Sequence, residues 1–223
     1  MDGLAFEVAH LFAALLVLLS FVQLYQDRLS ALLNVFALHA FALAASVAWQ
    51  AYIQHAPHLY VTAAIAVVFK GLIVPMALHR IIQRLGIHRE IETVVGIGLT
   101  MLVGIALVAL SMVVMLQVTT GADPLARQDL AFALAVVLLG LLLMVSRRNA
   151  VSQVVGFMSM ENGLMLAASA AQGMPLVVEI SIAFSVLIAL IVIGIFLFRI
   201  RERFDTVDVA ALDRFRGERG EQV

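Results

Sequence analysis

Three ionisable side chains lie within long apolar stretches of the sequence, where they could carry protons or ions. Lys70 is central in one apolar run, and Glu161 lies near the middle of another. Glu179 lies near the start of a third run, in the part predicted below to face the outside of the membrane. A charged side chain is costly in hydrocarbon, so ionisable groups at such positions are candidates for a translocation pathway. We therefore predict that Glu161, Glu179 and Lys70 take part in moving a proton or a cation.

Each of these side chains also has a structural interpretation. Glu161 could be a protonated glutamate that hydrogen-bonds across helices. Glu179 could lie close enough to the outer interface to be partly hydrated. Lys70 could pair with a carboxylate of a neighbouring subunit and so hold an interface together, because structural ion pairs occupy buried positions as well.

The residues around Glu161 and Lys70 favour helices that are packed inside protein. Gly71 follows Lys70 directly, and Pro75 comes five residues after it. Proline frees a backbone carbonyl and can kink a helix. The segment with Glu161 carries a stripe of small residues, which lets a second helix approach closely; the stripe consists of Ser152, Gly156, Ser159 and Gly163.

Two histidines, His10 and His39, also lie in apolar runs and raise the question of a haem. If the N-terminus lies outside, as the distribution of positive charge predicts below, and each residue adds about 1.5 Å, His10 is about 9 Å and His39 about 21 Å below the outer surface of the membrane. Two axial ligands of one haem must face each other at the same depth, so polar packing or a pair between Glu7 and His10 is the better interpretation. The chain has no cysteine, which excludes disulfides, iron–sulfur clusters and thiolate metal sites. We expect no cofactor and no metal site in this chain.

The elements that position these side chains are predicted to be transmembrane helices. Hydrophobic residues make up 63% of the 223 residues and charged residues only 13%, whereas soluble domains have about 45–50% and about 25%. A run of about 20 apolar residues can cross a bilayer. The sequence has seven runs of roughly that length, at 4–25, 29–53, 59–78, 94–118, 130–145, 151–171 and 176–198. The predicted fold is an all-α, polytopic membrane protein with seven transmembrane helices.

The distribution of positive charge predicts how these helices cross the membrane. Loops 1/2, 3/4 and 5/6 and the C-terminal tail together hold 12 of the 14 lysines and arginines, whereas the opposite side holds only Arg127. Because positive residues concentrate on the cytoplasmic side, we predict an N-terminus outside and a C-terminus in the cytoplasm. We divide the chain into a four-helix region at 1–120, a three-helix module at 121–199 and a charged tail at 200–223.

The three-helix module resembles the K subunit of respiratory complex I and the C subunit of Mrp-type antiporters. In that pattern an Arg-Arg-Asn turn, here residues 147–149, opens the second helix. A glycine, here Gly156, and a mid-helix glutamate, here Glu161, follow it. A second glutamate, here Glu179, lies in the third helix. With four helices before this module and the string 153–157 leading to Glu161, the chain is similar to the hydrogenase 4 component E family. Members of that family are membrane subunits of formate-hydrogenlyase-like, complex I-related group 4 hydrogenases.

This resemblance implies a membrane-arm subunit that contributes to proton or cation translocation coupled to electron transfer. It implies no catalytic site in this chain and no cofactor of its own, with the nickel–iron centre and the iron–sulfur clusters held by partner subunits. The expected partners are antiporter-like and complex I-like membrane subunits and soluble hydrogenase subunits, in a bacterial or archaeal cytoplasmic membrane, with no role for nucleic acid. Two alternatives stay open: a subunit of a multi-subunit Na⁺/H⁺ antiporter, and a structural subunit that bridges larger subunits and conducts nothing.

Overall fold

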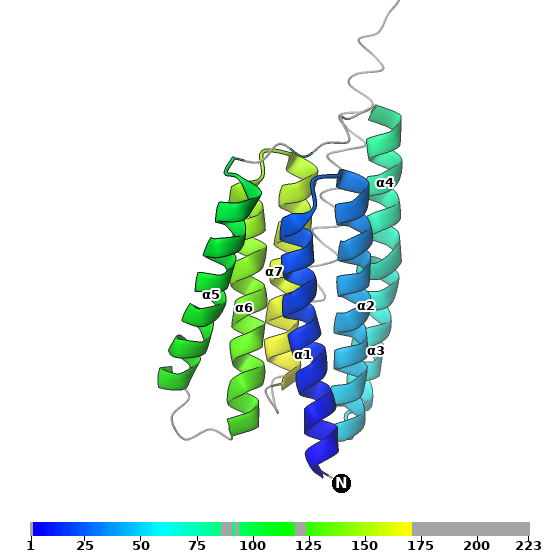
Figure 1. Cartoon of the computed structure of the whole chain (residues 1–223). Helices are drawn as coiled ribbons and strands as arrows, with labels where there is room; N and C mark the ends of the chain where they lie inside the picture. The colour runs from blue at the N-terminus through cyan, green and yellow to red at the C-terminus, as the bar shows by residue number, and fades with distance from the viewer. Residues whose placement is uncertain (1, 86–90, 92–93, 119–123, 171–223) are drawn as a thin grey trace, which may run out of the picture. The chain divides into compact units, whose positions relative to one another are not determined.

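The computed structural model describes residues 2–85, 91, 94–118 and 124–170, and the described elements are all helices (Figure 1). They belong to one compact unit. In chain order they are α1 (Asp2–Tyr25), α2 (Leu29–Ile53), α3 (Pro57–Ile65), the π-helix η1 (Ala66–Ile73), α4 (Val74–Leu85), α5 (Ile97–Val118), α6 (Pro124–Ser146) and α7 (Ala150–Ala170).

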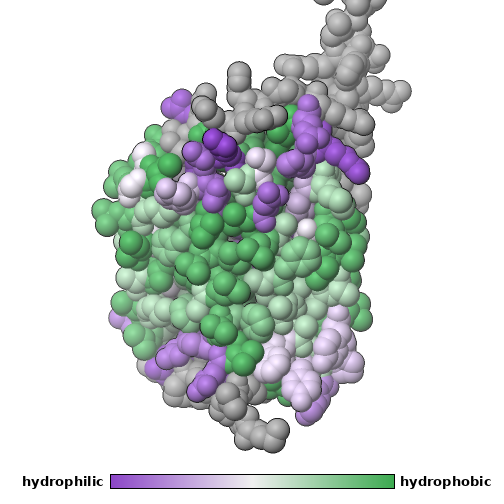
Figure 2. Space-filling model, turned by 45° about the vertical axis from the view of Figure 1, so that its right-hand side comes forward, coloured by the Kyte–Doolittle hydropathy of each residue, from purple (hydrophilic) through white to green (hydrophobic). Residues whose placement is uncertain are grey.

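Five helices in the described part are long and apolar enough to cross a membrane: Phe6–Tyr25, Leu29–Ile53, Pro57–Gln83, Ile97–Val118 and Arg127–Ser146. On the face shown in Figure 2, apolar side chains form a band between more polar zones at the two ends. The prediction of an α-helical membrane protein is therefore confirmed, with five of its predicted spans. The seventh predicted span, at 176–198, lies outside the described residues. The total of seven and the orientation stay predictions.

The sixth predicted span corresponds to α7, which has 21 residues but is not among the five apolar candidates. Its polar side chains lower its hydropathy, and most of them are turned toward other helices: Ser152, Ser159, Glu161 and Asn162 are all buried. A helix that is covered by protein needs less apolar surface than one that faces lipid.

The third span is longer than predicted. We predicted a helix at 59–78 followed by a break that begins at His79, but α3, η1 and α4 run on from one another to Leu85. The prediction was wrong because this end is amphipathic: Leu78 and Ile82 are buried, whereas Arg80 and Gln83 are exposed. Hydropathy alone cannot separate such an end from a loop, since both are polar on average.

Glycines allow close packing between α6 and α7. A Cβ at Gly140 would lie 2.5 Å from the backbone nitrogen of Met160. A Cβ at Gly156 would lie 2.9 Å from Met144 N, and one at Gly163 would lie 2.8 Å from the backbone nitrogen of the α6 residue opposite it. Two members of the predicted small-residue stripe therefore face α6, as expected of residues that allow close approach.

The connections that carry arginines meet at one end of the bundle. The amide of Ile91 donates to the carbonyl of Asp27 at 2.8 Å, and that of Val94 donates to the carbonyl of Ser146 at 2.9 Å. These bonds place Ile91 and Val94, from the α4–α5 connection, beside the α1–α2 and α6–α7 connections, and Figure 1 shows the latter two at the same end of the bundle. The predicted topology places the loops that carry arginines on one side of the membrane, in agreement with this arrangement. Which side of the membrane this end faces stays a prediction.

Candidate functional site

Lys70 is the central residue of the Pro57–Gln83 span and lies within the π-helix η1. The amide of Val74 bonds to the carbonyl of Phe69, five residues back. Pro75 has no N–H, so position 75 cannot donate to the carbonyl of Gly71, as in an α-helix, or to that of Lys70, as in a π-helix. The disturbance predicted near Pro75 therefore takes the form of a π-helical segment, a feature that occurs frequently at functional sites.

Lys70 forms an ion pair with Glu161, which brings together two of the three predicted site residues. Lys70 Nζ lies 3.2 Å from Glu161 Oε1, and the two side chains are 2% and 5% exposed. The carboxylate partner of Lys70 thus comes from this chain, from the middle of α7. Buried charges of this kind are tolerated only when they are paired and hydrogen-bonded. The third predicted residue, Glu179, lies outside the described residues.

A chain of hydrogen bonds continues from Lys70 into α2 and α1. Lys70 Nζ donates to Asn162 Oδ1 at 2.9 Å, and Asn162 Nδ2 lies 3.0 Å from His39 Nδ1. His39 Nε2 lies 3.2 Å from Ser20 Oγ, and the Ser20 hydroxyl donates to the carbonyl of Leu16 at 2.9 Å. The side chains of Ser20, His39, Lys70, Glu161 and Asn162 are all buried. We call these five residues the central polar cluster.

A second buried contact joins α7 to α1. The Ser159 hydroxyl donates to Gln23 Oε1 at 2.7 Å, and both residues are buried. Ser159 belongs to the predicted small-residue stripe, but it faces α1, whereas the glycines of the stripe face α6. Helix α7 therefore meets α6 through its glycines, α1 through Ser159 and η1 through Glu161.

Sequence reasoning missed three members of the central polar cluster. Asn162 and Ser20 were given no role, and His39 was assigned to ordinary polar packing. Each is a polar residue inside an apolar run, which is the signal that could have drawn attention to it. Their partners could not be known, because they come from different helices.

His10 bonds to Asp129 of α6, with Nδ1 and Oδ1 2.8 Å apart. The predicted partner Glu7 is exposed. Asp129 was missed because we predicted that the fifth span begins at residue 130, whereas α6 begins at Pro124. Both ring nitrogens of His39 are engaged by protein side chains, and His10 has its own carboxylate partner.

The Arg-Arg-Asn turn at 147–149 fixes the start of α7. The Asn149 side-chain oxygen accepts from the amide of Val151 at 2.8 Å, which is a helix N-cap contact. The Arg147 guanidinium is buried and donates to the carbonyl of Leu24 at the end of α1. Burial lowers the pKa of Arg147, and the nearby Asp27 carboxylate partly opposes this effect.

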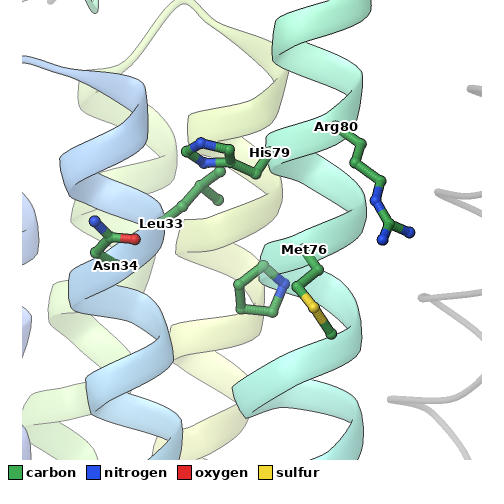
Figure 3. A pocket seen from close by; sticks show the side chains of 6 residues that line it. Leu33, Asn34, Met76, His79 and Arg80 are labelled. Atoms are coloured by element: carbon green, nitrogen blue, oxygen red, sulfur yellow. The ribbon is translucent and has the colours of Figure 1, made fainter.

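A separate groove of about 320 Å³ lies between α2 and α4, near the arginine-bearing end. Figure 3 shows Asn34 on one side of it and His79 and Met76 on the other. It shares no residue with the central polar cluster. The residues that line it are Leu33, Asn34, Pro75, Met76, His79 and Arg80.

Comparison with known proteins gives two kinds of relative. No family model and no solved structure matches the chain significantly. The chain is 28% identical over 203 residues to the uncharacterized protein Rv0085 of Mycobacterium tuberculosis, covering 90% of this chain and 92% of the relative. It is 33% identical over 168 residues to hydrogenase-4 component E of Escherichia coli K12, covering 73% of this chain and 76% of the relative. Hydrogenase-4 component E of Shigella flexneri matches to the same extent.

Proposed function

Because this chain belongs to the hydrogenase-4 component E family, we propose that it is an integral subunit in the membrane arm of a hydrogenase complex. In this proposal it contributes to proton or cation translocation that is coupled to electron transfer. The redox centres belong to partner subunits, and the complex lies in a bacterial or archaeal cytoplasmic membrane. Five apolar spans with short connections support an integral subunit that acts together with other proteins.

The observation that carries the translocation role is the buried ion pair between Lys70 and Glu161. Its two members are an acid and a base 3.2 Å apart, at the middle of their helices. Transfer of one proton from Lys70 Nζ to Glu161 Oε1 converts the ion pair into a neutral amine and a neutral acid. Either state can be buried, because neither leaves an isolated charge in the bundle. Net movement then needs two further steps: the neutral Glu161 acid gives its proton to a neighbouring group on one side, and the neutral Lys70 amine takes a proton from a group on the other side, which restores the ion pair.

Membership of a hydrogenase complex is tested by purification under mild detergent. We expect a tagged chain to bring down hydrogenase subunits and hydrogen-oxidising activity measured with an artificial electron acceptor. Recovery of Na⁺/H⁺ antiporter subunits without hydrogenase would contradict the proposal and support the antiporter alternative. Translocation by the purified chain alone in liposomes, at a physiological rate, would also contradict a subunit role.

The translocation role is tested by two substitutions of one residue. Glu161→Gln keeps the size and shape of the side chain but cannot carry a proton. We expect it to assemble at a lower yield, because the buried Lys70 charge loses its partner, and to keep hydrogen chemistry with an artificial acceptor. Each assembled complex should lose most of the ion gradient that turnover builds in vesicles. A purely structural role gives the opposite balance: Glu161→Gln would be nearly silent, and Glu161→Ala would fail in assembly. His10, whose partner Asp129 lies on α6, provides the matched control as His10→Gln, which should leave the gradient unchanged.

A further inference from the structure

We propose that Asn162 and His39 are positioning residues that hold the Lys70 amine beside Glu161 while the carboxyl group gains or loses a proton. Asn162 does this by direct contact with Lys70, and His39 does it by fixing the orientation of the Asn162 amide. The inference rests on the translocation role proposed above, and it adds two residues from the hydrogen-bond chain that links η1 and α7 with α2 and α1.

The direction of every bond in this chain follows from its first member. The Lys70 amine is the donor to Asn162, so the Asn162 atom that faces it must be the carbonyl oxygen. The Asn162 amide nitrogen then faces His39 Nδ1, and because that nitrogen can only donate, Nδ1 must be an unprotonated acceptor. A neutral His39 therefore carries its proton on Nε2 and donates it to Ser20 Oγ. The Ser20 hydroxyl in turn donates to the carbonyl of Leu16.

This arrangement leaves the Asn162 amide only one orientation. If the amide turned over, its nitrogen would face the Lys70 amine and its oxygen would face His39. Both contacts would then need new donors and acceptors, inside a region where Lys70, His39 and Asn162 are at most 2% exposed. Reorientation in such a region leaves unsatisfied polar groups, which is costly. His39 and Ser20 thus lock the oxygen of Asn162 onto Lys70.

The Lys70 amine needs this second acceptor because its first acceptor changes charge during proton transfer. When Glu161 is protonated, the electrostatic attraction that holds Lys70 is lost, whereas the bond to the Asn162 carbonyl oxygen is kept. Lys70 has a long, flexible stem that could otherwise turn away from the carboxyl group. Held at 2.9 Å by Asn162, the amine stays within reach of Glu161 Oε1 for the return step.

The tautomer of His39 tests the positioning chain without any transport assay. We would label histidine with nitrogen-15 in the full-length chain, reconstitute it in lipid, and assign His39 through its backbone neighbours. The structure predicts a neutral ring with its proton on Nε2. A neutral ring with its proton on Nδ1, or a doubly protonated ring, would overturn the proposal, because neither can accept from Asn162 at Nδ1.

Substitutions then test whether the chain acts on translocation. We expect His39→Leu and Asn162→Leu each to lower hydrogen-dependent translocation roughly tenfold, since each removes a hydrogen bond on which the position of a charged group depends. His39→Gln, which keeps one acceptor and one donor, should restore a large part of the loss. A purely structural role predicts no difference between His39→Gln and His39→Leu once both are folded. The matched controls are Asn34→Leu and His79→Leu in the groove between α2 and α4, which should leave translocation unchanged.

The two proposals fail in different ways. If Glu161→Gln leaves translocation intact, the proposed function is wrong, whatever the tautomer of His39. If Glu161→Gln abolishes translocation but His39 has its proton on Nδ1, the function stands and the positioning role is wrong. If His39→Leu or Asn162→Leu is not recovered folded, the tautomer of the unaltered protein still decides.

Discussion

The contact between Lys70 and Glu161 makes a quantitative prediction about stability. At a separation of 3.2 Å and an effective dielectric constant of about 20, the attraction between the two charges is about 5 kcal/mol. Removing one partner leaves the other charge buried, which typically costs about 3–5 kcal/mol, whereas replacing both is far less costly. We therefore expect Lys70→Met and Glu161→Gln each to destabilise the chain by about 3–5 kcal/mol, and the double variant by clearly less than the sum.

The measurement is a double-mutant cycle on the purified full-length chain, with its free energy of unfolding followed in mixed micelles during titration with a denaturing detergent. We expect a coupling energy of about 2–3 kcal/mol between the two positions, near the upper end for residues in contact. Arg80 is exposed and supplies the control: Arg80→Met combined with Glu161→Gln should be additive. A coupling energy for Lys70 and Glu161 within about 0.5 kcal/mol of zero would refute the contact itself.

Three further predictions address packing, the arginine turn and topology. Gly140→Leu should prevent folding or strongly lower the yield, because a Cβ there would meet backbone at 2.5 Å. Gly98→Leu, where a Cβ would have nothing within 4 Å, should fold normally. The two variants are compared by their detergent-solubilised yield and their thermal unfolding. Arg147→Gln should destabilise the chain by about 1–3 kcal/mol through loss of a buried hydrogen bond from a charged group. Arg148→Gln, at an exposed neighbour, should not destabilise it. The free energy of unfolding in detergent distinguishes the two variants, and equal effects would contradict the difference in burial. A reporter at Arg147 and another fused after Val223 should both report the cytoplasm, and opposite sides would rule out seven spans.

Much of the helical framework could be predicted from hydropathy. The second span was predicted at 29–53 and α2 occupies Leu29–Ile53, because apolar residues fill it and polar residues flank it on both sides. The method failed where a helix becomes amphipathic, as α4 does between His79 and Gln83. It also placed the start of α6 too late and so missed Asp129, whose polarity is satisfied by a partner on another helix.

The partners within the candidate site could not be predicted from the sequence. Lys70 and Asn162 are 92 positions apart, and hydropathy gives the depth of a residue on its helix but not which neighbour the residue faces. His39 illustrates this limit: its depth spoke against a shared haem with His10, but only the arrangement of α2 against α7 shows that it contacts Asn162. Knowledge of helix neighbours, which depends on packing across the whole bundle, is the missing step.

The central claim is that Glu161 changes its protonation state during turnover. The most direct measurement is an infrared difference spectrum of the intact complex, recorded between the oxidised state and the state reduced by hydrogen, in H₂O and in D₂O. We predict a carboxylic-acid carbonyl band that shifts in D₂O, is lost in Glu161→Gln, and is retained in Asp129→Asn, a substitution at the other buried carboxyl group in the described part of the chain. An unchanged band in Glu161→Gln would contradict the claim, because the proton would then be carried by another group.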